Sequence, residues 1–175
     1  MISRVLTLFK TLVQIILLRK GPEYIPHSTV LLVIVVALWL LVGVVDVMVV
    51  EAYTSSDLLM DMVLALVGLG FYVIIVANFG RSARLARCVT AILGCSIVFS
   101  VVLSGGRLVL PLLLTDSEID WISQLIWFWS IPVEGHIIAR TIERPWFIGF
   151  LIALAVLFAQ LQLFVFLKPT ILPAT

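Results

Sequence analysis

Charged side chains are scarce in this sequence. Asp, Glu, Lys and Arg make up 12% of its 175 residues, about half of the roughly 25% that is usual in soluble domains. Apolar residues make up 63%, against roughly 45–50% in soluble domains. A soluble fold of this length cannot hide so much apolar surface from water. The composition therefore argues against a soluble domain and indicates an integral membrane protein.

A large net charge and a disulfide framework are also missing. The formal net charge is +1, so bulk electrostatics give no reason to expect a nucleic-acid partner. The two cysteines, Cys88 and Cys95, lie seven positions apart in one apolar segment. On a helix this spacing is about 10 Å of rise, which is too far for a disulfide within the chain. We interpret both cysteines as packing residues.

Motifs of known catalytic sites are absent too. The sequence has no Ser-His-Asp arrangement with suitable partners, no intramembrane-protease signature and no glycine-rich phosphate loop. Haem ligation needs axial histidines within membrane spans, and only His136 comes near that situation. We therefore predict that the protein is not an enzyme and has no cofactor and no metal. The alternative is an intramembrane enzyme or redox subunit centred on Glu134 and His136.

Residues 2–20 have the pattern of an amphipathic helix. Polar side chains recur there at spacings of three and four, which places them on one helical face: Ser3, Arg4, Thr7, Lys10, Thr11 and Gln14. A lysine at the centre of a spanning helix costs about 3 kcal/mol. We therefore expect this helix to lie in the membrane interface, with its basic face towards anionic lipid. Packing of the helix on the rest of the protein is the alternative.

Five apolar runs follow, after Pro22 and Pro26 have ended the first helix. Each run has the length of about 20 residues that crosses a bilayer, and the runs lie at 29–50, 57–78, 87–106, 119–139 and 146–167. The pattern predicts an all-α integral membrane fold, a five-helix transmembrane bundle preceded by an amphipathic interfacial helix. Its parts are a cytoplasmic helix and linker (1–28), a five-span transmembrane domain (29–167) and a short outer-side tail (168–175).

The third run continues as far as Leu114. A break is predicted before that point by four residues that disfavour a regular helix in a membrane, Gly105, Gly106, Arg107 and Pro111. We expect the remainder to be an outer re-entrant or interfacial stretch, because it is too short for another span.

The basic residues predict the orientation of the bundle. Nine of them fall on one side of the predicted membrane: Arg4, Lys10, Arg19, Lys20, Arg81, Arg84, Arg87, Arg140 and Arg144. The other side has only Arg107 and Lys168. Cytoplasmic loops carry the excess of Lys and Arg, so we predict a cytoplasmic N-terminus, an outer C-terminus and a location in the bacterial inner membrane.

Three ionisable residues are predicted at similar depth near the outer ends of the first three spans: Asp46, Asp61 and Arg107. Buried charges in a membrane are expensive and need partners. We interpret these residues as an ion-pair cluster that locks the three helices together. The alternative is a site where a cation or a proton enters the bundle.

A second polar group lies in the fourth run, just after Pro132, which is expected to kink the helix. Glu134 and His136 are two positions apart and face different directions, whereas His136 and Arg140 share a face. The three residues form a candidate proton or polar site, since histidine titrates near neutral pH. We favour a structural hydrogen bond from this group to the cytoplasmic loops over a metal site completed by His27.

Small residues recur at helical spacing in two of the runs. Ser96, Ser100 and Ser104 follow one another at every fourth position, as do Gly149 and Ala153. Small side chains allow helices in membranes to approach closely. We therefore predict that these residues pack helices together.

The outline of the chain resembles the bacterial members of the Yip1-type family. The resemblance consists of a short cytoplasmic N-terminal segment, five closely spaced spans, minimal loops and the polar, proline-containing lead-in Gly21-Pro22-Glu23-Tyr24. It covers most of the chain in topology and contains no specific motif. It implies a role as a membrane organiser or trafficking factor, and it carries over no functional residues.

These observations lead to one expected function and one alternative. We expect a non-enzymatic accessory or scaffold subunit that acts through helix–helix contacts in a larger membrane assembly. Its partners would be membrane lipids and either other membrane-protein subunits or further copies of itself. The alternative is a transporter or channel component in which Asp46, Asp61 and Glu134 form a path for a proton or a cation.

Overall fold

The computed structural model describes residues 2–49 and 54–171, and in these ranges every regular element is a helix. The α-helices are α1 (Ile2–Ile16), α2 (Thr29–Val49), α3 (Ser55–Asn78), α4 (Leu85–Val109), α5 (Asp116–Ile142) and α6 (Trp146–Ile171). Three short 3-10 helices connect them: η1 (Pro22–Tyr24), η2 (Ser82–Arg84) and η3 (Leu110–Leu112). The prediction of an all-α fold is confirmed. Of the predicted outer tail, 168–171 continue α6 and 172–175 lie outside the described residues.

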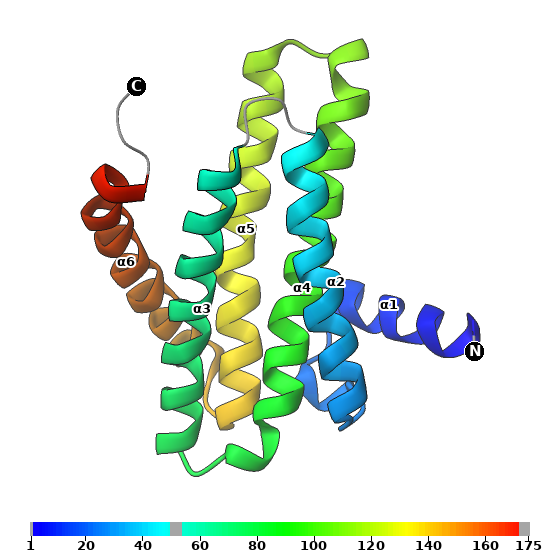
Figure 1. Ribbon diagram of the computed structural model, residues 1–175. Coiled ribbons are helices and arrows are strands. Elements are labelled where there is room, and N and C mark those ends of the chain that lie inside the picture. The colour runs from blue at the N-terminus through cyan, green and yellow to red at the C-terminus, as the bar shows by residue number, and fades with distance from the viewer. Residues whose placement is uncertain (1, 50–53, 172–175) are drawn as a thin grey trace.

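The long helices form a bundle with α5 at its centre. In Figure 1, α2, α3, α4 and α5 run side by side, α6 leans outward along one side of the bundle, and α1 lies at a steep angle to the bundle axis. The most extensive contacts join α5 to α6, α2 to α4 and α4 to α5. Helix α5 also contacts α1, α3 and η1. It is therefore the helix that holds the others together.

Four of the described helices are long and apolar enough to cross a membrane: α2, α3, α4 and α6. Helix α1 is apolar but shorter. Helix α5, which contains the predicted run 119–139, is 27 residues long but is not among the four. Its first turn carries two acidic residues and its interior contains Gln124, Glu134 and His136, which lower its mean hydropathy.

The predicted break at Gly105, Gly106 and Arg107 is wrong. Helix α4 continues through these residues to Val109 and ends where η3 contains Pro111. A glycine in a helix costs only about 1 kcal/mol, whereas proline removes a hydrogen bond and clashes with the preceding turn. As a consequence, α4 and α5 extend beyond the neighbouring ends of α2 and α3 (Figure 1).

Helix α5 begins directly after this connection with a capping box. The backbone N–H of Thr115 donates to the Glu118 carboxylate at 2.8 Å, and the Thr115 hydroxyl donates to the same oxygen. Both bonds lower the pKa of Glu118, and the bond from the Thr115 backbone has the larger effect. Helix α3 begins in the same way at Thr54. Both helix starts lie at the same end of the bundle.

The N-terminal helix is shorter than predicted. It ends at Ile16 because Leu18 adopts a left-handed conformation with φ of 58°, and the N–H of Arg19 closes the end by bonding to the Gln14 carbonyl. Leu12 and Ile15 are buried against the bundle, mainly on α4. The structure therefore shows that this helix packs on the rest of the protein, as in the alternative, while its place relative to the membrane interface stays a prediction.

The buried core lies towards the end of the bundle where α1 and η1 join it. Its members include Cys88 and Cys95, whose thiols are free and buried, so the interpretation of both as packing residues is confirmed. Large apolar side chains on α2 and α6 remain exposed, among them Met48 and Phe166, which are each 79% exposed. The apolar surface of the molecule therefore faces outward along its length.

Helices α5 and α6 approach so closely that only glycine fits between them. A Cβ atom added to Gly149 would lie 2.6 Å from the backbone nitrogen of Ala139 and closer still to the carbonyl oxygen of Gly135. A Cβ atom added to Gly135 would lie 2.7 Å from the Cα of Phe150. These obstacles are backbone atoms, which cannot move aside without separating the helices.

We therefore expect Gly149→Ala to lower the thermal midpoint of the purified protein in mild detergent, because overpacking costs about 1–3 kcal/mol. The matched control is Gly105→Ala, a helical glycine with nothing within 4 Å of its added Cβ. The control gains helix propensity without a clash. If the two variants had equal midpoints, the close α5–α6 contact would be incorrect.

Candidate functional site

A cavity of about 510 Å³ lies among α2, α3, α4, α5 and α6. We call it the central cavity. Each helix contributes residues at spacings of three and four, which lie on one helical face. On α3, for example, these are Asp61, Ala65, Gly68 and Tyr72. The cavity is thus built from one face of every long helix in the bundle.

Three carboxylates from three helices line the central cavity: Asp46 from α2, Asp61 from α3 and Glu134 from α5. Asp61 is exposed, and Asp46 and Glu134 are half-buried. Further polar groups come from α3, α4, α5 and α6, namely Tyr72, Ser96, Ser100, Ser130 and Gln160. No Lys or Arg is among the described residues that line it. The lining therefore carries formal negative charge.

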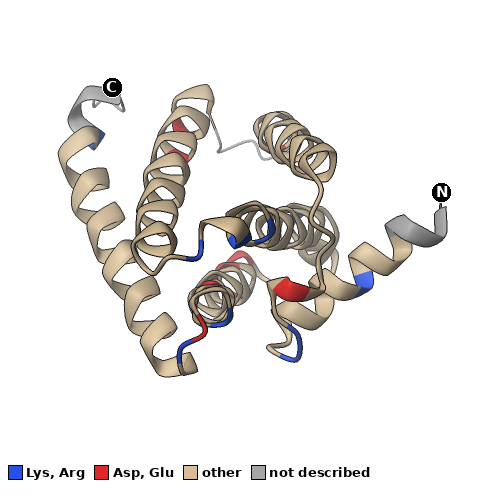
Figure 2. Cartoon of the chain, turned by 90° about the horizontal axis from the view of Figure 1, so that it is seen from below, with Lys and Arg blue, Asp and Glu red and all other residues tan. Residues whose placement is uncertain are grey.

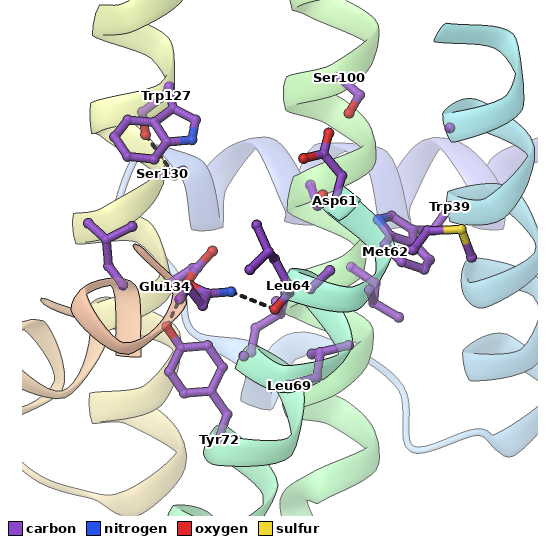
Figure 3. Close-up of a pocket in the computed structure, with 18 of the residues that line it drawn as sticks. Trp39, Asp61, Met62, Leu64, Leu69, Tyr72, Ser100, Trp127, Ser130 and Glu134 are labelled. Carbon is purple, nitrogen blue, oxygen red and sulfur yellow. Dashed lines mark hydrogen bonds between the residues drawn. The ribbon is translucent and has the colours of Figure 1, made fainter. Parts of the chain in front are cut away.

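Glu134 is held by a hydrogen bond across the bundle. The Tyr72 hydroxyl of α3 donates to its Oε2 at 2.6 Å, and the tyrosine ring is 4% exposed. In Figure 3 the Tyr72 hydroxyl points towards Glu134, with Asp61 and Ser100 further up in the same view. The Tyr72 bond therefore orients the Glu134 carboxylate, which lies below Asp61 and Ser100 in Figure 3.

The other end of the cavity is formed by Asp46 and Asp61. Asp46 accepts a hydrogen bond from the Ser104 hydroxyl of α4. Arg107 does not line the cavity, and its guanidinium lies 3.9 Å from the Asp120 carboxylate. Of the three residues predicted to form an outer cluster, the structure thus brings the two aspartates to one cavity and directs Arg107 towards α5.

The three residues of the second predicted group point to different places. Glu134 lies in the central cavity, whereas His136 Nε2 is 3.0 Å from the Lys20 carbonyl and Arg140 donates to Glu23 at 2.5 Å. The prediction that His136 and Arg140 share a face is confirmed, and so is a structural hydrogen bond from His136 to the loop. Helix α5 runs on through Pro132 without interruption.

The N-terminal segment is attached to α5 by these bonds and by one more. The indole N–H of Trp129 donates to the Ile16 carbonyl at 3.0 Å, at the point where α1 ends. Within the described ranges no three His, Cys, Asp or Glu side chains lie close enough to hold a metal ion. The metal site that we considered, with His27, is therefore not formed by the residues proposed for it.

The small residues take several roles. Ser96, Ser100 and Ala153 line the central cavity, Ser104 bonds to Asp46, and Gly149 forms the close contact between α5 and α6. All five residues thus face the interior of the bundle, and Ser104 and Gly149 contact another helix of this chain directly.

Tyr72 and the tryptophans of the cavity were not predicted as site residues. The signal for Tyr72 was present, because it lies on the same helical face as Asp61 at a spacing of 11 positions. The partner of Gln160 could not be foreseen: its amide donates to the Leu64 carbonyl at 2.8 Å, across the contact with Gly68. Trp39 and Trp127 line the cavity from α2 and α5.

Comparisons of the chain with models of protein families, with curated proteins and with solved structures find no match. The resemblance to the Yip1-type family therefore stays a prediction.

We expect Tyr72→Phe to lower the free energy of unfolding by about 1 kcal/mol, because it removes the donor to a carboxylate inside the bundle. Chemical denaturation in mixed micelles measures this change. The control is Tyr24→Phe, since Tyr24 is 56% exposed and its ring contacts Lys20. Equal stability of Tyr72→Phe and the wild type would contradict the bond to Glu134.

Proposed function

We propose that this chain is a multi-pass membrane protein whose central cavity takes up a proton or a small cation and passes it along the bundle. The observation that carries the proposal is the convergence of Asp46, Asp61 and Glu134 on one cavity from three helices. Carboxylates inside a membrane bundle are costly, and in membrane proteins they mark ion and proton paths.

The surroundings of these carboxylates support cation binding. Three carboxylates and no Lys or Arg are among the described lining residues, so the lining favours cations over anions. Hydroxyl groups of Ser96 and Ser100 lie on the same cavity wall and supply oxygen atoms of the kind that replace water around a cation. Asp61, the most exposed of the three carboxylates, would be the first to meet an incoming ion.

We further propose that the protein has five membrane spans, α5 in addition to the four apolar helices α2, α3, α4 and α6. The 27 residues of α5 correspond to about 40 Å of helix, more than the roughly 30 Å of a bilayer core. Contacts with α3, α4 and α6 surround it, so its polar side chains need not face lipid. This arrangement would explain why α5 tolerates a lower hydropathy than its neighbours.

The proposed orientation has a cytoplasmic N-terminus, an outer C-terminus and the bacterial inner membrane as location. It is supported by the arginines of the η2 and α5–α6 connections at one end of the bundle, visible from below in Figure 2. The acidic starts of α3 and α5 are at the opposite end.

Helix α1 would then lie in the membrane interface while also contacting the bundle. One part of its apolar surface, with Leu12 and Ile15, is covered by protein. Another part, with Leu6 and Phe9, is 52% and 53% exposed. The exposed part is suited to lipid.

The test is an ion-flux assay in liposomes of defined lipid. Wild-type protein is expected to dissipate a proton or potassium gradient faster than empty liposomes, and Asp46→Asn and Glu134→Gln are expected to lose most of this flux. The control is Asp120→Asn, which removes a carboxylate that lies near Arg107 outside the cavity. Flux no greater than in empty liposomes, or unchanged in both cavity variants, would reject the proposal.

A second candidate function is the accessory or scaffold subunit expected from the sequence, with lipids and either other membrane subunits or further copies as partners. The observation that favours it is the projecting α4–α5 connection. Leu112 and Leu113 at its tip are each 81% exposed and Trp121 is 68% exposed. The packing surfaces within the bundle give it no support, because they are used inside the chain.

Cysteine cross-linking tests this second function. If the tip contacts a second copy, Leu113→Cys is expected to give a covalent dimer in native membranes, whereas Ser82→Cys at the opposite end is not. The native cysteines are buried and should not contribute. A monomer in both variants, together with no co-purifying subunit, would exclude the role.

A further inference from the structure

A second pocket, of about 460 Å³, lies at the opposite end of the bundle from Asp46 and Asp61. We call it the basic pocket. It is formed by η1, the start of α4 and the end of α5, segments that lie near one another in Figure 2. Its charged lining residues are Glu23, Arg84, Arg87, Arg140, Glu143 and Arg144. It shares no lining residue with the central cavity.

The charges of the basic pocket do not balance. Four arginines and two glutamates leave a formal excess of two positive charges. Both glutamates are already paired, Glu143 with Arg84 and also with Arg81, and Glu23 with Arg140. The ion pairs therefore leave the remaining arginines of the lining without a carboxylate.

Those remaining arginines are Arg87 and Arg144. Neither forms an ion pair with a described residue. The guanidinium of Arg144 lies over the Phe79 ring, 5.7 Å from its centroid. The Nε of Arg87 is buried and has no hydrogen-bond partner in the part of the chain that the structure describes.

A buried N–H group without an acceptor is costly, by about 1–3 kcal/mol, and native structures contain few of them. An acceptor supplied by a ligand would remove this cost. The start of α4 points to the same kind of ligand, because its N-cap has no side-chain hydrogen bond and helix N-termini attract anions. Arg87 is in the first turn of this helix.

We infer that the basic pocket binds a phosphate group, with Arg87 and Arg144 as its principal ligands. Planar guanidinium groups match phosphate oxygens in pairs. The ion pairs of Glu143 and Glu23 hold the neighbouring Arg84 and Arg140 at the rim. Glu143 itself has a left-handed backbone with φ of 56°, so the chain turns sharply there and brings Arg144 towards α4.

The phosphate has two possible sources, the headgroup of an anionic phospholipid and a soluble phosphorylated molecule. The pocket is large enough for more than a bare phosphate ion. The inference does not depend on ion passage through the central cavity, since the two sites share no residue.

The experiment uses the full-length protein in two arms. In the first, protein in a non-ionic detergent is titrated with inorganic phosphate or glycerol phosphate, against chloride at equal ionic strength, and its thermal midpoint is followed. In the second, the protein is placed in nanodiscs of phosphatidylcholine alone or with phosphatidylglycerol, and bound lipid is measured by native mass spectrometry.

We expect saturable binding in at least one arm, weakened roughly tenfold to hundredfold by Arg87→Gln and by Arg144→Gln, since each removes charge-assisted hydrogen bonds. Arg87→Lys, which keeps the charge but not the planar fork, is expected to bind with intermediate affinity. The matched control is Arg19→Gln, an exposed arginine outside the pocket.

Binding in the first arm assigns a soluble phosphate, and binding in the second alone assigns a lipid headgroup. The inference fails if neither arm shows saturable binding, or if Arg19→Gln weakens binding as much as the pocket variants do. Should Arg87→Gln not fold, Arg144→Gln and Arg87→Lys decide the result by the same criteria.

Discussion

The carboxylate of Glu134 is the group on which the arrangement of the helices depends. It lies inside a bundle whose outer surface is apolar, where a charged or polar group without a partner is expensive. Its partner is the Tyr72 hydroxyl of α3, and the close contact of Gly135 with α6 begins at the next residue. Glu134 and Gly135 together therefore join α5 to α3 and to α6, the helices that form much of the wall of the central cavity.

Helix α5 contributes to both pockets and to the attachment of the N-terminal segment, because its faces contact different parts of the molecule. One face directs Glu134 into the central cavity, a second binds the N-terminal segment through His136 and Arg140, and its C-terminal end contributes Arg140 and Thr141 to the basic pocket. Each of these polar side chains lowers the hydropathy of the helix. The same residues that make α5 the least apolar of the long helices thus make it the helix with the most varied contacts.

Much of the fold could be predicted from the sequence, because apolar runs and helix-ending residues act locally; helix ends such as Asn78 and Trp146 agree with the predicted runs. The end of α1 at Leu18 and the passage of α4 through Gly105 depend on packing that the sequence pattern does not contain. For the site, the order and direction of the predicted spans correctly placed Asp46 and Asp61 at the same end of the bundle. The bond between Tyr72 and Glu134 joins residues 62 positions apart, and no spacing rule predicts which faces of distant helices meet.

The most direct test of the central claim is the reactivity of a cysteine placed in the cavity wall. Ser100 lines the cavity, whereas its neighbour Val101 is 55% exposed on the apolar surface. In membranes, Ser100→Cys is expected to react with a charged thiol reagent, and faster with a cationic than with an anionic one, because the lining is negative. Val101→Cys is expected to react little, since such reagents do not enter lipid. Equal rates at the two positions, or a preference for the anionic reagent at Ser100→Cys, would contradict a cation-accepting cavity.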